Sequence, residues 1–301
     1  MNIVVLMSSY NGEKYIRSQI DSIIAQKGKF KIDILVRDDG SDDKTIDILN
    51  EYKNKGVLKW YSGKNLGTAH SFIDILCRAK GYDYYAFADQ DDYWFVDKLE
   101  RAVKSLEKIC GPGLYFSNAE LVDENLNSFG KKVYKKTPKT DLKTLSCSGG
   151  ILGCSIVINK ELAQIVQQKN NPTKMVMHDF YLAELCLALH GKIIADDKAT
   201  LKYRQHNDNV IGVSASFKGI VKNRIKDIFT KSKVGIDEQA ECLLELYEDM
   251  MPMDSIVWLQ KISKYKENFI NRFLLATNSA TRYVNTNMAI KIRLSILLGN
   301  R

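Results

Sequence analysis

Short apolar runs rich in β-branched and aromatic residues alternate with amphipathic stretches over the first ~120 residues, and this alternation limits the fold more than any other feature. Strands are expected over residues 3–7, 32–36, 57–61 and 82–88, with helices over 12–26, 44–53 and 69–79 between them. Strands that alternate with helices in this way form a mostly parallel sheet with helices on both faces. The predicted fold class is therefore α/β, with a Rossmann-like sheet flanked by helices.

The rest of the chain is expected to divide near residue 212. Before that point the α/β pattern continues, with strands over 151–158 and 193–195 and helices over 161–168 and 180–190. Residues 129–143 carry six lysines against one aspartate, which predicts an exposed loop. Residues 217–301 contain one proline and no convincing strand. We therefore expect a catalytic or binding domain over 1–212, followed by a C-terminal helical appendage over 213–301.

Length and composition narrow the class of protein. With 301 residues and 45% hydrophobic side chains, the chain can bury a substantial core, which excludes wholesale disorder. Its six cysteines form no Cys-x-x-Cys pair, so neither a disulfide scaffold nor a zinc ribbon is expected. A net charge of +8 permits nucleic acid, an anionic membrane or a phosphorylated small molecule as partner, and selects none of them.

Targeting and membrane-spanning signals are missing from this sequence. Residues 1–7 are apolar but lack a basic lead and a cleavage site, and no window reaches the roughly 18 consecutive apolar residues of a spanning helix. We therefore expect a cytoplasmic protein, either free or peripheral at the inner face of the cell membrane. The basic stretch 218–233 fits contact with anionic lipid about as well as it fits a solvated helix face.

The acidic sequence Asp89-Gln90-Asp91-Asp92 follows directly after the apolar strand expected at 82–88. Three carboxylates within four residues repel one another unless a cation neutralises them. Oxygen ligands suit a hard divalent ion, so Mg²⁺ or Mn²⁺ shared with a substrate diphosphate is one interpretation. The other is an acidic loop in which Asp92 caps a helix over 93–109. Spacing alone does not separate the two, and the apolar strand before the motif favours the metal.

A second acidic turn, Asp38-Asp39-Gly40-Ser41-Asp42, follows the strand expected at 32–36. Aspartates at such a strand end can accept hydrogen bonds from a nucleobase or a ribose. An Asx-type turn that caps the next helix explains the same residues, and taken alone it is the better explanation. Because ligands bind beyond the carboxyl ends of parallel strands, we expect residues 8–11, 38–41 and 89–92 on one edge of the sheet.

Two later polar segments are also candidates. His178-Asp179 precedes the helix expected at 180–190, where the carboxylate either caps the helix or acts as a general base on a substrate hydroxyl. The segment Tyr203-Arg204-Gln205-His206-Asn207 is expected at a strand end. A histidine there can complete a metal shell, although a lone histidine more often hydrogen-bonds a neighbouring turn.

Several common motifs are absent from the sequence. No Gly-x-Gly-x-x-Gly follows the first strand and no Walker-type lysine loop occurs, which disfavours dinucleotide-binding and P-loop proteins. No Gly-x-Ser-x-Gly occurs either, which disfavours a serine hydrolase.

Together and in this order, the motifs resemble family 2 glycosyltransferases of GT-A fold, in particular rhamnosyltransferase-like bacterial members. The segments that carry the resemblance are Ser8-Ser9-Tyr10-Asn11-Gly12 with Tyr15, Asp38–Asp42, Asn65-Leu66-Gly67, Asp89–Asp92 with Trp94 and Lys98-Leu99, His178-Asp179, and Tyr203–His206 with Asn209 and Gly212. The resemblance covers about residues 1–212 and says little about 213–301. Ser8-Ser9 departs mildly from the usual pattern, in which Thr or Ser is followed by Tyr-Asn.

The resemblance also implies a role for each matching residue. Nucleotide-sugar binding would involve Ser8, Tyr10, Glu13, Asp38, Asp39, Asn65, Asp89 and Asp92. Asp91 would be the first metal ligand, with Asp89 and, less securely, His206 as further ligands of Mn²⁺ or Mg²⁺. Asp179 falls where the family keeps its catalytic base. Contacts with the donor sugar or the acceptor would come from Trp94, His178 and Arg204.

The reaction implied by this resemblance is a metal-dependent, inverting sugar transfer from a nucleotide-diphosphate donor to a hydroxyl of a cell-surface or lipid-linked glycan. A bound cation stabilises the charge that develops on the departing diphosphate. Inversion needs one base, unlike the paired carboxylates of glycoside hydrolases. The expected donor is dTDP-L-rhamnose, with a UDP-hexose as the alternative.

Three other functions fit the sequence less well than glycosyl transfer. A nucleotidyltransferase of related fold usually has a glycine-rich loop with a basic residue after its first strand, which residues 8–12 lack. A nucleic-acid binder is favoured by the net charge alone, and its aromatic-basic motifs are absent, so no nucleic-acid partner is expected. A non-catalytic sugar-binding relative is disfavoured by the intact carboxylates at 89, 91 and 179. The oligomeric state stays open.

Overall fold

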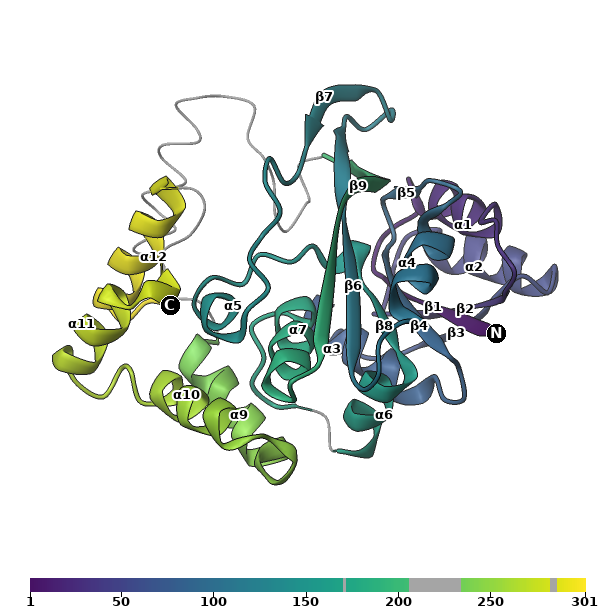
Figure 1. The fold of residues 1–301 in the computed structure, drawn as a ribbon. Helices are drawn as coiled ribbons and strands as arrows, with labels where there is room; N and C mark the ends of the chain where they lie inside the picture. The colour runs from purple at the N-terminus through teal and green to yellow at the C-terminus, as the bar shows by residue number, and fades with distance from the viewer. Residues whose placement is uncertain (170–171, 206–233, 282–285) are drawn as a thin grey trace. The chain divides into compact units, whose positions relative to one another are not determined.

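The computed structural model describes residues 1–169, 172–205, 234–281 and 286–301, and the chain forms two compact units (Figure 1). Unit 1 comprises residues 1–137, 152–171 and 191–204. Unit 2 comprises residues 138–151, 172–190 and 205–301. The units therefore interleave along the chain, whereas the sequence suggested one boundary at residue 212, a position outside the described residues.

Unit 1 is built on a nine-stranded mixed sheet in the order β3-β2-β1-β4-β8-β6-β9-β5, with β7 paired to β6. The strands are β1 (Asn2–Ser9), β2 (Lys31–Asp38), β3 (Lys59–Ser62), β4 (Tyr84–Asp89), β5 (Tyr93–Trp94), β6 (Gly113–Val122), β7 (Ser128–Lys132), β8 (Val157–Asn159) and β9 (Lys192–Arg204). β1 runs parallel to β2 and β4, while β8 is antiparallel to both β4 and β6. The α/β class predicted from the alternating pattern is confirmed.

Helices pack on this sheet through one apolar face each. They are α1 (Ile16–Ile24), α2 (Thr45–Asn54), α3 (Gly67–Arg78), α4 (Lys98–Leu106) and α6 (Lys160–Gln168), with a short 3₁₀ turn over Gly153–Ser155. In α1, for example, Ile16, Ile20 and Ile23 are buried at helical spacing. All five residues of β1 from Ile3 to Met7 are inaccessible to solvent, as expected of a strand covered on both faces.

Helices joined by loops make up unit 2, and its described residues form no strand (Figure 1). Its helices are α5 (Leu142–Ser148), α7 (His178–Ala188), α9 (Ile236–Tyr247), α10 (Met253–Ser263), α11 (Phe269–Thr277) and α12 (Thr286–Leu297), with 3₁₀ turns over Glu248–Met250 and Ser279–Thr281. The expected C-terminal helices are therefore present. α5 and α7 join them because α7 is buried on almost every side and packs against α5, which in turn packs against α10.

Several elements differ from the sequence-based expectation. The helix expected from residue 93 begins at Lys98, because Tyr93 and Trp94 instead pair with β9 as the short strand β5. Residues 129–143 are not a simple loop, since Ser128–Lys132 forms the fully exposed strand β7 and α5 begins at Leu142. Lysines on such an edge strand discourage pairing with another chain.

The second half of the sheet was the least predictable part. Residues 151–158 contain only the start of β8, preceded by a 3₁₀ turn. The ten-residue strand β6, which no expected element covered, forms the centre of this half. β9 extends from 192 to 204 rather than over 193–195, because it pairs with β6 along most of its length.

Two sequence-based predictions cannot be placed in the fold. His206 and the basic stretch 218–233 lie outside the described residues. Among the helices of the described segments, none is both long and apolar enough to cross a membrane.

Candidate active site

Three polar loops meet at one edge of the unit 1 sheet. The register pairs Ser8 of β1 with Asp89 of β4, and Ser9 of β1 with Asp38 of β2. All three strands run parallel and end at this edge, which is where ligands bind in open α/β sheets. The juxtaposition of residues 8–11, 38–41 and 89–92 predicted from sequence is therefore confirmed.

The first loop is held in place by Gln90 of the acidic turn. The backbone N–H of Tyr10 donates to Gln90 Oε1 (2.9 Å), and Gln90 Nε2 donates to the carbonyl of Tyr10 (2.9 Å). A side chain at Gly12 would collide with Gln90, since an added Cβ would lie 2.2 Å from its Oε1. The Tyr10 side chain remains 49% exposed at the rim of the sheet.

Asp38 is fully buried and forms an Asx-type turn. Its Oδ2 accepts hydrogen bonds from the backbone N–H groups of Gly40 (3.0 Å) and Ser41 (2.9 Å). The Asx-turn interpretation from sequence is therefore supported, whereas the helix cap expected from Ser41 or Asp42 is not, because α2 begins at Thr45 after Lys44 without a side-chain cap. A nucleoside contact by Asp38 stays a prediction.

Asp39 fixes the start of α3. Its carboxylate forms a buried ion pair with Arg37 and accepts hydrogen bonds from the backbone N–H groups of Leu66 (2.9 and 3.0 Å) and Gly67 (2.9 Å). Asn65 Oδ1 also accepts from the Gly67 N–H, at 3.1 Å. Negative charge at a helix N-terminus is stabilised by the helix dipole. These bonds shape the loop on which both residues lie.

Glu13 and Ser8 have structural partners as well. Glu13 Oε2 accepts from the backbone N–H of Lys44 (2.9 Å), the residue just before α2. The hydroxyls of Ser8 and Ser71 lie 2.6 Å apart in a hydrogen bond. Both residues therefore help to join the strand-end loops to the helices that follow them.

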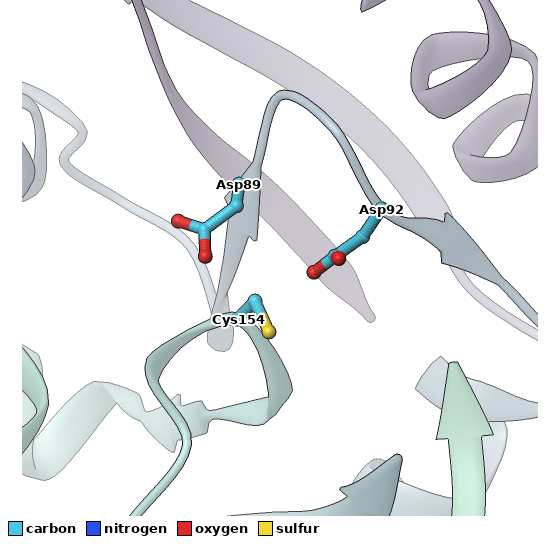
Figure 2. Close-up of side chains that lie close together, drawn as sticks. All are labelled: Asp89, Asp92 and Cys154. Atoms are coloured by element: carbon cyan, nitrogen blue, oxygen red, sulfur yellow. The ribbon is translucent and has the colours of Figure 1, made fainter. Parts of the chain in front are cut away.

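Asp89, Asp92 and Cys154 form a compact cluster at the end of β4 (Figure 2). One carboxylate oxygen from each aspartate and the Cys154 sulfur all lie within 4.8 Å of one another. Cys154 comes from the 3₁₀ turn before β8, so it is distant in sequence from the acidic motif. Sequence analysis missed this cysteine, because no spacing rule links it to Asp89–Asp92.

Asp92 is the most unusual member of the cluster. Its side chain is inaccessible to solvent, and its Oδ1 accepts a hydrogen bond from the backbone N–H of Arg204 (3.3 Å). Its Oδ2 receives no hydrogen bond from any N–H or O–H group of the described residues. Burial, followed by the charges of Asp91 and Asp89, raises the pKa of Asp92 well above its usual range. A buried carboxylate oxygen without such a donor is costly unless a cation or ligand group completes it.

Arg204, at the end of β9, is hydrogen-bonded to the acidic turn. Its Nε donates to the backbone carbonyl of Asp91 (2.7 Å), a second guanidinium nitrogen donates to the carbonyl of Glu124, and the guanidinium lies 4.4 Å from the centre of the Tyr15 ring. The side chain is buried, and burial lowers its pKa. Arg204 therefore positions the turn, and a direct contact with sugar stays a prediction.

Lys98 and Trp94 are buried next to the Cys154 backbone. Lys98 is inaccessible to solvent, and its Nζ donates to the carbonyls of Cys154 and Ser155 (3.2 Å each) while lying 4.6 Å from the centre of the Trp94 ring. Burial lowers the pKa of Lys98 to about 8. Trp94 is 1% exposed, so the structure places it in the core and offers no support for the expected sugar contact.

His178 and Asp179 occupy the first turn of α7 in unit 2. Both are buried, and Asp179 Oδ1 accepts from the backbone N–H of Phe180 (2.7 Å). Burial lowers the pKa of His178 to about 3, so this imidazole is neutral at physiological pH. The carboxylate therefore has a position and a partner typical of a helix start, and its catalytic role stays a prediction.

The cluster of Asp89, Asp92 and Cys154 provides donor atoms for a metal ion. Asp89 and Asp92 supply oxygen ligands of the kind that Mg²⁺ and Mn²⁺ prefer, and Cys154 adds a softer sulfur. The buried Oδ2 of Asp92 is an open ligand position. The residues therefore fit a divalent ion. Asp91, the first choice from sequence, is partly exposed and is not a member of this cluster.

Comparison with known proteins agrees with the fold. The family model described as Glycosyl transferase family 2 matches residues 4–163. The dTDP-rhamnosyl transferase RfbG of Shigella flexneri is 32% identical over 244 residues, which cover 72% of this chain and 80% of that protein.

Two solved structures share the fold at low sequence identity. S. aureus TarS 1–349 in complex with UDP-GlcNAc has a TM-score of 0.55 at 16% identity, over 99% of this chain and 91% of that one. The mannosyltransferase PcManGT of Pyrobaculum calidifontis, in complex with GDP-Man and Mn²⁺, has a TM-score of 0.53 at 15% identity, over 99% and 86%. The GT-A-like fold expected from the motifs is confirmed, and the chain is a glycosyltransferase that belongs to glycosyl transferase family 2.

Proposed function

We propose that this glycosyltransferase moves a sugar from a nucleotide-diphosphate donor to a hydroxyl of a cell-surface or lipid-linked glycan, with inversion at the sugar. The observation that carries the proposal is the sheet edge at which the strands ending in Ser8, Asp38 and Asp89 lie side by side, with the buried Oδ2 of Asp92 in the acidic turn that follows. A dTDP-L-rhamnose donor is supported by the 32% identical rhamnosyl transferase. A UDP-hexose donor is the second candidate, supported by the fold shared with TarS.

Asp89, Asp92 and Cys154 are the residues that we propose to hold Mn²⁺ or Mg²⁺, with Asp91 as the further ligand suggested by the family motif. When bound, such an ion stabilises the negative charge that develops on the leaving diphosphate. The sulfur of Cys154 favours Mn²⁺ over Mg²⁺, because Mg²⁺ strongly prefers oxygen ligands. Arg204 and Lys98 keep the turn and the cysteine in place through their bonds to backbone carbonyls.

The nucleoside is expected at the first loop. The ring of Tyr10 is half exposed beside the strand ends and offers a surface on which a base can stack. The turns around Asp38 and Asp39 fix the loop on which the donor would rest, since both carboxylates are bonded to backbone N–H groups there.

Asp179 is the proposed general base. An inverting transfer needs a single group that takes the proton of the acceptor hydroxyl as that oxygen attacks. The N-terminal turn of α7 stabilises the ionised carboxylate of Asp179, which keeps it able to accept a proton. Its neighbour His178 is neutral and so does not compete as a charged partner.

Thermal-shift titration of the full chain with UDP, dTDP, GDP and CDP, with and without Mn²⁺, tests the proposal. A ligand that binds only the folded state raises the melting temperature by mass action. We expect a rise with dTDP that requires Mn²⁺, followed by turnover of dTDP-L-rhamnose. A rise with UDP alone would move the donor to a UDP-hexose. No response to any of the four nucleotides would contradict both the metal and the donor assignments.

A further inference from the structure

Helix α11 exposes an apolar face. Phe269, Ile270, Phe273 and Leu274 are 63%, 69%, 51% and 50% exposed, and their spacing places them on one side of the helix. The rings of Phe269 and Phe273 stack with their centres 6.4 Å apart. Leu275 and Ala276, on the other side, are buried. The helix is therefore already packed through Leu275 and Ala276, and the face that it leaves exposed is apolar as well.

Helix α12 continues the same pattern. Ile290, Leu294 and Leu298 recur every fourth residue along the helix and just past its end, and they are 50%, 43% and 46% exposed. Ile292 and Ile296 are buried. α11 and α12 pack against each other within unit 2 (Figure 1). We call these seven exposed side chains of the two helices the apolar surface.

The charged side chains of the two helices are all basic, since α11 and α12 contain Arg272, Lys291 and Arg293 and no aspartate or glutamate; the nearest acidic residue, Glu267, lies exposed just before α11. Lys291 and Arg293 of α12 are partly exposed, and helical spacing places them on either side of Ile290 and Leu294. Arg272 lies on the packed side of α11, and its Nε is buried. Two copies of such a surface would repel each other, whereas an anionic bilayer complements it in both polarity and charge.

We propose that the apolar surface of α11 and α12 docks this protein on the surface of an anionic lipid bilayer. The apolar side chains enter the boundary between headgroups and acyl chains, and Lys291 and Arg293 contact lipid phosphates. The contact is peripheral, because neither helix is long enough to span a bilayer. This inference goes beyond the proposed function and does not depend on the donor or the metal.

Co-sedimentation of the full chain with vesicles tests the proposal. The vesicles contain either phosphatidylcholine alone or an equal mixture of phosphatidylcholine and phosphatidylglycerol. We expect binding to the anionic vesicles that weakens with added salt, and about a tenfold loss of binding in the double variant Ile270→Glu/Phe273→Glu. Both positions are exposed, so the variant should fold. Ile24→Glu, at a 49% exposed position of α1 in unit 1, is the matched control and should bind like the unchanged chain.

Three outcomes would overturn the proposal. The unchanged chain does not bind anionic vesicles, or the double variant binds them as well as Ile24→Glu does. Alternatively, sedimentation velocity without lipid detects a dimer that only the double variant dissociates, which assigns the apolar surface to a second copy. Mn²⁺-dependent nucleotide shifts measured on the same variants report on the donor site separately, so failure of the proposed function is distinguishable.

Discussion

The two units treat buried polar groups in opposite ways. In unit 1, Asp38 and Asp39 at the strand ends are surrounded by hydrogen-bond and ion-pair partners, as Asp39 is by Arg37 and the start of α3. In unit 2, burial shifts two groups toward their neutral forms, since the pKa of His178 is lowered to about 3 and that of Glu184 is raised to about 7. Asp92 belongs to unit 1 yet has an oxygen without an N–H or O–H donor in the described structure, and it is there that we propose the metal site.

The sharpest test of this contrast is removal of charge from the acidic turn. Asp91→Ala and Asp92→Asn are each expected to lower metal-dependent turnover by about 10³-fold, because the charge on the leaving diphosphate then lacks its stabilising ion. Asp92→Asn should also raise the melting temperature measured without metal at pH values where Asp92 would ionise, because burial and the charges of Asp91 and Asp89 disfavour its ionised form. Steady-state kinetics across Mn²⁺ concentrations and thermal melts provide the two measurements.

A carboxylate close to the turn provides the control for these variants. Asp97 pairs with Lys198 and lies outside the cluster, so Asp97→Asn should leave turnover nearly unchanged. If Asp91→Ala retains full activity while Asp92→Asn loses it, Asp89, Asp92 and Cys154 are sufficient ligands. Retention of activity by both variants would remove the metal assignment.

Asp179→Asn should separate chemistry from donor binding. Loss of the general base is expected to slow transfer by about 10²–10⁴-fold, while the Mn²⁺-dependent nucleotide shift is unchanged. Asparagine can still accept from the Phe180 N–H, so the start of α7 should survive. Asp254→Asn, another first-turn aspartate of unit 2, is the control and should transfer normally. Unfolding of Asp179→Asn with an intact control would show that the carboxylate serves the helix rather than the reaction.

The smallest expected effect concerns pH and the buried groups of unit 2. The pKa of Glu184 is raised from 4.5 to about 7, so its contribution to stability is present below pH 4.5 and is lost as the pH rises through 7. The pKa of His178 is lowered from 6.5 to about 3, so its contribution is present above pH 6.5 and is lost as the pH falls through 3. Between pH 4.5 and 6.5 the two slopes oppose each other and largely cancel.

Glu184→Gln should remove the pH dependence of stability that comes from Glu184, so that the opposite dependence from His178 becomes measurable. Gln239 Nε2 donates to Glu184 Oε2 (2.7 Å), a bond that the amide oxygen of glutamine can accept. We expect the free energy of unfolding of the variant, relative to the unchanged chain, to rise by about 1.4 kcal/mol per pH unit between pH 4.5 and 6.5. Denaturant melts at several pH values measure it. A difference that does not change with pH would show that Glu184 ionises as freely in the folded state as in the unfolded state.

Prediction from sequence was strongest where local patterns decide the structure. The buried run Ile3–Met7 and the polar turns after β1, β2 and β4 were all placed correctly, because a parallel sheet brings its strand ends to one edge. It was weakest where pairing is distant. β5 exists as a strand through its pairing with β9, more than a hundred residues away, as the register of Tyr93 with Lys202 illustrates. β9 in turn pairs mainly with β6, as Gly113 does with Lys192.

The sequence by itself determined the α/β class, the glycosyltransferase motifs and the carboxylates that we propose for the donor site, since each depends on residues close together in the chain. Only the tertiary structure decided which of the candidate side chains are buried or already bonded to other groups of the protein. Trp94 became part of the core, Arg204 became a support for the acidic turn, and Cys154 joined Asp89 and Asp92. The physical reason is that burial and hydrogen-bond partners depend on neighbours in space, which spacing along the chain does not encode.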